Sequence, residues 1–232
     1  MRRTLIILTA LASLALVYGV VWYMQGTFTP GETNGENEVQ EEKRMSVTTA
    51  IVSEETAEYV IDAQYPKFDN LAIDSAIEKF INDAITQFKA QTSEAPSFPS
   101  ETRYEFDSIF NSTYVGSDLV SARLTISTYT GGAHSAAFVR GLNFGRTTGR
   151  ELTLDDALAM VDLSLEQVAD LATEELRTRL GDDVFFSEGA EVARENYQTF
   201  VVSADNVTFI FQPYQVASYA AGFQEVSFGR ER

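Results

Sequence analysis

Alternating hydrophobic and polar residues predict an N-terminal hairpin and a later group of paired strands. From 57 to 65, Ala, Tyr, Ile, Ala and Tyr occupy every second position, with Glu, Val, Asp and Gln between them. A period of two is typical of a half-buried strand, and the apolar run at 47–52 supplies its hairpin partner. The same alternation predicts an antiparallel meander with one polar face, formed by three further strands: 104–114, 120–127 and 136–144.

Apolar residues at helical spacing predict two longer helices. Asn70 is placed to cap a helix whose apolar positions run over 73–88. Ser164 and Gln167 form a capping-box pattern before a second helix at 165–180. Together the elements predict an α+β fold with a mostly antiparallel sheet and helices packed on one side of it. The remaining predicted elements are helical turns at 154–160 and 191–198, a hairpin of 200–203 with 207–211, and a last strand at 225–228.

An uncharged run of 20 residues at 5–24 predicts one N-terminal transmembrane helix. At 1.5 Å per residue such a helix is about 30 Å long, the thickness of a hydrocarbon core. Trp22 and Tyr23 lie at its far end, where amphipathic rings favour the membrane interface, and Arg2 and Arg3 favour the cytoplasmic side. We expect an uncleaved signal anchor in the cell membrane with the remainder of the chain extracytoplasmic. A cleaved signal peptide is the alternative, although no convincing Ala-x-Ala site accompanies the run.

Composition divides the chain into three parts. Residues 1–24 form the predicted membrane anchor. Residues 25–45 are rich in Gly, Asn and Glu and contain almost nothing apolar, which predicts a solvated, flexible acidic linker. Residues 46–232 are numerous enough to bury one substantial core, and they form the predicted extracytoplasmic domain.

The charge balance excludes several functional classes. The 232 residues include 34 Asp and Glu against 17 Lys and Arg, a formal charge of −17. Such a chain is a poor nucleic-acid binder, because contacts to phosphate need Lys and Arg. The absence of Cys and the single His exclude disulfides, Cys-ligated metals and thiol nucleophiles, and we expect no cofactor and no metal. The acidic surface would attract a cationic protein, although acidity that serves only solubility explains the charge equally well.

Two groups of motifs resemble those of a known envelope domain. The first is Thr-Gly-Gly-Ala-His at 130–134, followed by Leu-Asn-Phe at 142–144 and Glu-Leu-Thr-Leu-Asp-Asp at 151–156. The second is Phe-Ile-Phe-Gln-Pro-Tyr-Gln-Val-Ala at 209–217 with Tyr-Ala-Ala-Gly at 219–222. In order and spacing they resemble the RsiV-type extracytoplasmic domain, a domain of unknown function. It is found in the anti-sigma-V factor RsiV and beside the catalytic domain of the peptidoglycan deacetylase PdaC.

The resemblance implies a bacterial α+β domain that faces the cell envelope on an N-terminal anchor. In RsiV the similarly placed ectodomain recognises lysozyme. Only residues 1–4 precede the predicted membrane helix, so we do not expect this chain to hold a sigma factor. No segment resembles the metal-dependent catalytic domain of PdaC. We therefore expect a binding domain without enzymatic activity, whose ligand is either a cationic, lysozyme-like wall-active protein or a peptidoglycan fragment.

The two groups of motifs supply the candidate ligand-binding residues. Gly131 and Gly132 would let the backbone approach a ligand closely, and His134 could exchange a proton near neutral pH. The alternative is that the glycines form a turn between strands and His134 satisfies a buried backbone group. Tyr214 and Tyr219 could form a platform for sugars or for a partner surface. Their alternative is structural, with buried rings and hydroxyls that cap loop carbonyls.

No catalytic signature is assembled in the sequence, and we assign no catalytic residue. A Gly-x-Ser-x-Gly nucleophile elbow is missing. Asp155 and Asp156 are one of several adjacent carboxylate pairs, and Asp156 suits the first turn of a helix. A carboxylate-dependent envelope glycan hydrolase and a scaffold for a membrane complex stay open as alternative functions.

Overall fold

The computed structural model describes residues 45–94 and 103–231. Within these ranges the chain forms eight strands, three α-helices and three short 3₁₀ helices. The predicted transmembrane helix at 5–24 and all but the last residue of the predicted linker at 25–45 lie outside them. Among the helices of the described ranges, none is both long enough and apolar enough to cross a bilayer.

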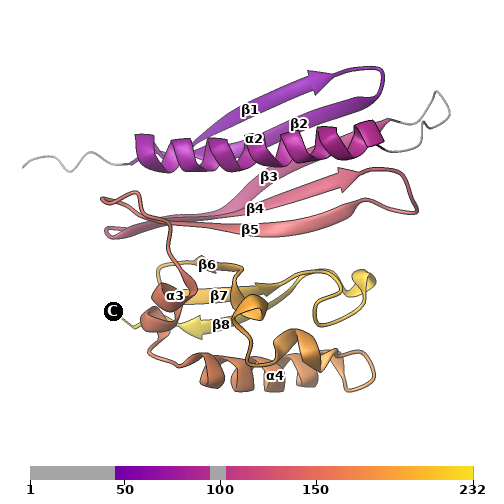
Figure 1. Ribbon diagram of the computed structural model, residues 1–232. Helices are drawn as coiled ribbons and strands as arrows, with labels where there is room; N and C mark the ends of the chain where they lie inside the picture. Colours follow the sequence, from indigo (N-terminus) through magenta and orange to yellow (C-terminus); the bar gives the residue numbers. More distant parts are fainter. Residues whose placement is uncertain (1–44, 95–102, 232) are drawn as a thin grey trace, which may run out of the picture. The chain divides into compact units, whose positions relative to one another are not determined.

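The first five strands form one sheet in which spatial order follows sequence order. Neighbouring strands are antiparallel except for β2 and β3, which run parallel. A parallel pair cannot be joined by a tight turn, and the helix α2 (Leu71–Glu94) supplies the crossover. The predicted hairpin and meander are both confirmed (Figure 1). The strands are β1 (Thr48–Glu55), β2 (Tyr59–Lys67), β3 (Tyr104–Val115), β4 (Leu119–Tyr129) and β5 (Ala136–Gly145).

The helix α2 packs on one face of this sheet through its apolar side. Asn70 Oδ1 accepts hydrogen bonds from the backbone N–H groups of Ala72 and Ile73, at 3.0 and 3.3 Å, so the predicted N-cap is confirmed. Apolar residues one helical turn apart are buried against alternate residues of the strands. This first core includes Ile73, Ile77, Ile81 and Phe88 from the helix and Ile61, Phe106, Leu124 and Ile126 from the sheet.

A second layer follows in the sequence, made of three antiparallel strands and two helices. The predicted capping box of Ser164 and Gln167 is present before α4, and the structure shows a second one, Thr153 with Asp156, before α3. The two helices pack on the three-stranded sheet and enclose a second core with it. The elements are α3 (Leu154–Val161), α4 (Leu165–Leu180), β6 (Phe200–Val202), β7 (Asn206–Phe211) and β8 (Gln224–Gly229), with 3₁₀ helices at Ser187–Ala190, Arg194–Tyr197 and Tyr219–Ala221.

This arrangement corrects one part of the predicted fold. The α+β class and the mostly antiparallel pairing are confirmed, but the helices do not pack on one side of a single sheet. Instead α2 packs on the five-stranded sheet, whereas α3 and α4 pack on the separate three-stranded sheet (Figure 1). The physical reason is that alternation marks a strand without specifying its partner, so β6, β7 and β8 could not be assigned to a sheet of their own.

The strand β6 approaches β5 so closely that one position of β5 requires glycine. A Cβ atom on Gly141 would lie 1.7 Å from the carbonyl oxygen of Phe200. No side-chain rotation can relieve an overlap with a backbone atom. Gly141 therefore lets the second sheet contact the backbone of the first.

Two buried polar side chains complete the junction of the two sheets. Because β6 pairs with β7 on one side only, the polar groups of its other edge need partners. Asn143 Nδ2 donates to the carbonyl oxygen of Phe200 at 2.7 Å, and the N–H of Val202 donates to Ser121 Oγ at 2.9 Å. The Ser121 hydroxyl in turn donates to Asn143 Oδ1 at 2.7 Å. One end of the meander face that we predicted to be polar is thus buried under β6.

Candidate binding site

The Gly-Gly motif forms the loop between β4 and β5. Gly131 and Gly132 have φ angles of 88° and 143°, which only glycine adopts readily. The hydroxyl of Tyr129 donates to the carbonyl oxygen of Gly132 at 3.2 Å across the loop. The loop is therefore a tight connection between strands, and it places His134 on the surface directly before β5 begins.

Three aromatic side chains from two distant segments meet beside this loop. The ring of His134 stacks on the ring of Tyr219, with centroids 4.2 Å apart and planes at 25°. The ring of Tyr219 also contacts the ring of Tyr214, with centroids 5.4 Å apart and planes at 41°. We call these three residues the aromatic stack. Sequence motifs separated by about eighty residues thus supply one surface feature.

Tyr219 fixes the stack to the protein. Its hydroxyl donates to the carbonyl oxygen of Ser135 at 2.6 Å, and His134 Nδ1 lies 2.8 Å from the same oxygen. Tyr219 thus caps a loop carbonyl, which was the structural alternative for the tyrosines. Tyr214 differs, because 62% of its surface is exposed and its φ angle is 69°. His134 is exposed as well and does not satisfy a buried group.

Two glutamines anchor the loop that carries both tyrosines. Gln212 exchanges two hydrogen bonds of 2.9 Å with the backbone N–H and carbonyl of Val139 on β5. Gln215 Oε1 accepts from the N–H of Gln212, and its Nε2 donates to the carbonyls of Gly189 and Asn196. This role of the two glutamines was not predicted from the sequence. The feature that could have indicated it is the pair of glutamines on either side of Pro and Tyr at 213–214. A side-chain amide can donate and accept hydrogen bonds, so it can take the place of a neighbouring strand for an unpaired backbone N–H and carbonyl.

Both loops of the stack lack charged side chains. No Asp, Glu, Lys or Arg occurs in 126–139 or in 208–224, although the chain as a whole is strongly acidic. Aromatic rings on a surface free of acidic and basic residues offer apolar faces and polar edges to a ligand. Such a surface suits stacking on a neutral sugar ring better than attraction of an ion.

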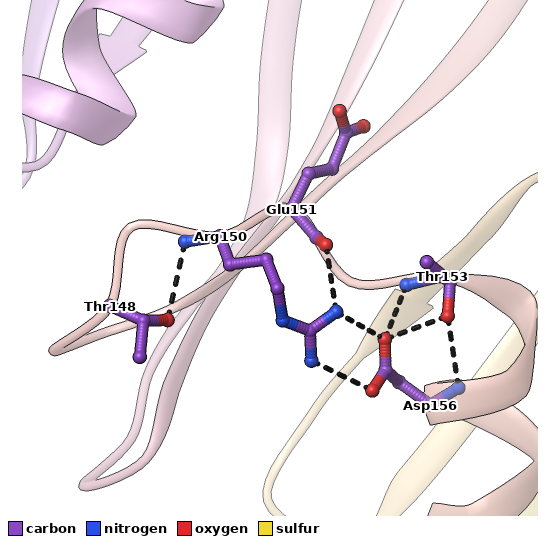
Figure 2. A network of polar contacts seen from close by, with 5 residues as sticks. All are labelled: Thr148, Arg150, Glu151, Thr153 and Asp156. Carbon is purple, nitrogen blue, oxygen red and sulfur yellow. Dashed lines mark hydrogen bonds and ion pairs between the residues drawn. The ribbon is translucent and has the colours of Figure 1, made fainter.

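The acidic pair Asp155–Asp156 is held by arginines at the start of α3. Arg150 contacts both carboxylate oxygens of Asp156 at 2.8 Å, and the N–H of Thr153 donates to Asp156 Oδ2 at 2.7 Å (Figure 2). The Arg150 hydrogen bond lowers the pKa of Asp156, and the Arg194 hydrogen bond lowers the pKa of Asp155. Both carboxylates are therefore ionised at neutral pH, which does not suit a general acid.

Within residues 45–94 and 103–231, no group of His, Asp and Glu side chains is arranged to hold a metal ion. The glycines, His134 and both tyrosines of the predicted site thus form one local cluster, whereas the acidic residues of α3 lie in a separate network of ion pairs.

Comparison with known proteins finds two family models, each similar to a different part of the described chain. A model described as "Deacetylase PdaC" matches residues 52–136, and a model described as "Protein of unknown function (DUF3298)" matches residues 159–231. The loop with His134 lies within the first match, and the loop with Tyr214 and Tyr219 lies within the second. The aromatic stack therefore joins both matched segments.

Among curated proteins, the chain is similar to the peptidoglycan-N-acetylmuramic acid deacetylase PdaC of Bacillus subtilis (strain 168). The two are 24% identical over 186 residues, which cover 79% of this chain and 39% of that protein. The chain thus spans well under half the length of this relative.

Two solved structures of DUF3298 family proteins share the fold. The protein from Bacteroides fragilis NCTC 9343 has a TM-score of 0.52 at 18% identity, and the one from Pseudomonas aeruginosa PAO1 has a TM-score of 0.58 at 15% identity. In both cases the similarity covers 80% of this chain and 90% of the other. The resemblance drawn from the sequence motifs is confirmed, because the chain is similar to PdaC over most of its length and its C-terminal part matches the DUF3298 model.

Proposed function

We propose that this chain is a binding protein of the bacterial cell envelope whose aromatic stack binds the glycan of peptidoglycan. The observation that carries the proposal is the surface stack of His134, Tyr219 and Tyr214, whose two loops contain no Asp, Glu, Lys or Arg. The similarity to PdaC, a protein that acts on peptidoglycan, supports the same ligand class. The proposal keeps the predicted topology, in which residues 5–24 anchor the chain and the folded part faces the wall.

The chemistry of a sugar ring fits this stack. The axial C–H groups of a pyranose make one face apolar, and that face packs on an aromatic ring, while the hydroxyls and N-acetyl groups point sideways to polar partners. Tyr214 and His134 are both exposed, and the ring of each contacts the ring of the half-buried Tyr219. The side chains of Gln212 and Gln215 hydrogen-bond to backbone groups of other segments and hold the tyrosine loop in place. Little conformational entropy is therefore lost on binding.

A cationic wall-active protein is the second candidate ligand. The formal charge of −17 favours it, because an acidic surface raises the rate of encounter with a basic partner. The two candidates differ in their response to salt. Binding of a neutral glycan to the stack should change little with ionic strength, whereas capture of a basic protein should weaken steeply.

The test measures binding of chitotetraose and of purified peptidoglycan fragments to the full chain in mild detergent by calorimetry. Tyr214→Ala and His134→Ala should each weaken binding about tenfold, the loss typical of a well-packed anchor of roughly 1.4 kcal/mol. Leu171→Ala, which removes an exposed apolar side chain on α4, is the matched control and should bind normally. Wild-type affinity in both stack variants would overturn the proposal, as would wild-type protein that binds neither ligand.

A further inference from the structure

A polar groove of about 400 Å³ lies along the outer edge of β5, apart from the aromatic stack. Its volume falls within the range of sites that hold small ligands. The start of α3, the 3₁₀ helix Arg194–Tyr197 and β5 itself form its walls. The side chains that give it chemical character are Arg140, Glu151, Thr153, Asp155, Arg194 and Gln198.

Two ion pairs give the groove both signs of charge. Arg194 Nη1 contacts Asp155 Oδ1 at 2.8 Å, with side chains 51% and 71% exposed. Arg140 Nη2 contacts Glu151 Oε1, with side chains 42% and 47% exposed. Each pair is made through one guanidinium nitrogen, and a guanidinium has five N–H donors in a planar fork. Both arginines thus retain hydrogen-bond donors, and both carboxylates retain acceptor oxygens, that a charged ligand can use.

The charges of the groove persist at neutral pH. The hydrogen bond from Arg194 lowers the pKa of Asp155, and Asp155 raises the pKa of Arg194. The wall that carries Asp155 is also rigid, because the network of Arg150, Thr153 and Asp156 fixes the first turn of α3 (Figure 2). A rigid groove with fixed charges loses little entropy when it binds.

The groove and the aromatic stack lie on one edge strand. At the start of β5 the carbonyl of Ser135 accepts the hydroxyl of Tyr219. Further along, Gln212 pairs with Val139, and the next residue, Arg140, lines the groove. At about 3.3 Å per residue, the strand from Ala136 to Arg140 covers roughly 13 Å. One ligand that extends along β5 can therefore contact both sites.

We propose that this groove binds the short charged peptide that peptidoglycan carries on its glycan. Peptidoglycan combines neutral sugars with peptides that bear carboxylates and, in many cases, an amino group. The neutral stack suits the sugars, whereas Arg140 and Arg194 can bind the carboxylates and Glu151 and Asp155 an ammonium group. The inference rests on the proposed function and extends it, because it makes the glycan–peptide junction the recognised element.

The test compares two ligands on the full chain: chitotetraose, which has no peptide, and a disaccharide–peptide fragment with free carboxylates. The wild-type protein should bind the fragment at least tenfold more tightly. Arg194→Gln should weaken binding of the fragment about tenfold and leave chitotetraose unaffected. Arg177→Gln is the matched control for charge loss. Arg177 is an exposed arginine on α4, and it pairs with Asp182, which follows the helix.

The results separate the two proposals. Equal affinity for both ligands, or normal binding of the fragment by Arg194→Gln, would overturn the peptide subsite while leaving the stack intact. Loss of both ligands in Tyr214→Ala supports the stack, and wild-type protein that binds neither ligand overturns both proposals. Amidation of the carboxylates of the fragment gives a readout that does not depend on any variant, and it should remove the preference for the fragment.

Discussion

Asn143 provides the sharpest test of how the two sheets are joined. Replacing it with Ala removes the donor to the carbonyl of Phe200 and the acceptor of the Ser121 hydroxyl, both at 2.7 Å. The Asn143 side chain is 2% exposed, so water cannot easily replace either bond. A buried polar group left without a partner costs about 1–3 kcal/mol. The Phe200 carbonyl loses this bond, whereas Ser121 Oγ still accepts from the N–H of Val202 and its loss lies near the lower limit, so we expect about 2–4 kcal/mol for Asn143→Ala.

The measurement is thermal and urea unfolding of the full chain followed by circular dichroism. For a protein of this size, about 2–4 kcal/mol corresponds to a fall in Tm of roughly 5–15 °C. Asn111→Ala is the matched control, because Asn111 lies exposed on β3 and its loss should change stability by less than about 0.5 kcal/mol. If Asn143→Ala lowers the free energy of unfolding no more than the control does, the proposed role of Asn143 in joining the two sheets is refuted.

A double-mutant cycle with Ser121 tests the bond between the two side chains. Ser121→Ala also deprives the N–H of Val202 of its acceptor, so it should destabilise the protein on its own. Because the Ser121–Asn143 bond is lost in either single variant, the double variant should cost less than the sum of both. Strict additivity would show that the two side chains act independently.

Three further substitutions test other parts of the structure. Gly141→Ala should cost more than about 3 kcal/mol or prevent folding, because its Cβ would lie 1.7 Å from the carbonyl oxygen of Phe200; a normal Tm would contradict this. Tyr197→Phe removes a buried hydroxyl that donates to the carbonyl oxygen of Ala190 at 2.7 Å, and urea unfolding should show a loss of about 1–2 kcal/mol. Asp156→Asn should cost about 1–2 kcal/mol at pH 7. The pKa of Asp156 is lowered in the folded state by Arg150, so this cost should shrink as the pH falls below about 4, and a cost independent of pH would refute the ion pair.

The local elements could be predicted because their signals are local. Ser164 with Gln167 forms a capping box in the structure as in the sequence, and Asn70 caps α2. The pairing of the strands could not be predicted in the same way. Alternation is the same whether a strand pairs in parallel or antiparallel, so the parallel contact of β2 with β3 was invisible, and so was the division into two sheets.

The residues of the candidate site could be predicted from the sequence, but their arrangement into one surface could not. The motifs identified His134, Tyr214 and Tyr219 separately, and nothing in the sequence indicated that their rings touch. That contact depends on Gln212, whose side chain replaces a ladder partner for Val139 far away in the sequence. Long-range contacts of this kind follow from the tertiary fold, which a motif does not encode.

The position of both proposed subsites follows from a requirement of the fold. β5 is an edge strand, and an edge strand leaves a row of backbone N–H and carbonyl groups that must be covered. The second layer covers this edge with single contacts: Tyr219 at the carbonyl of Ser135 and Gln212 at the N–H and carbonyl of Val139. Side chains and loops cover an edge less continuously than a paired strand does. The spaces that they leave are lined by rings at one end and by ion pairs at the other, so the same contacts that protect the edge also create a surface on which an extended ligand can bind.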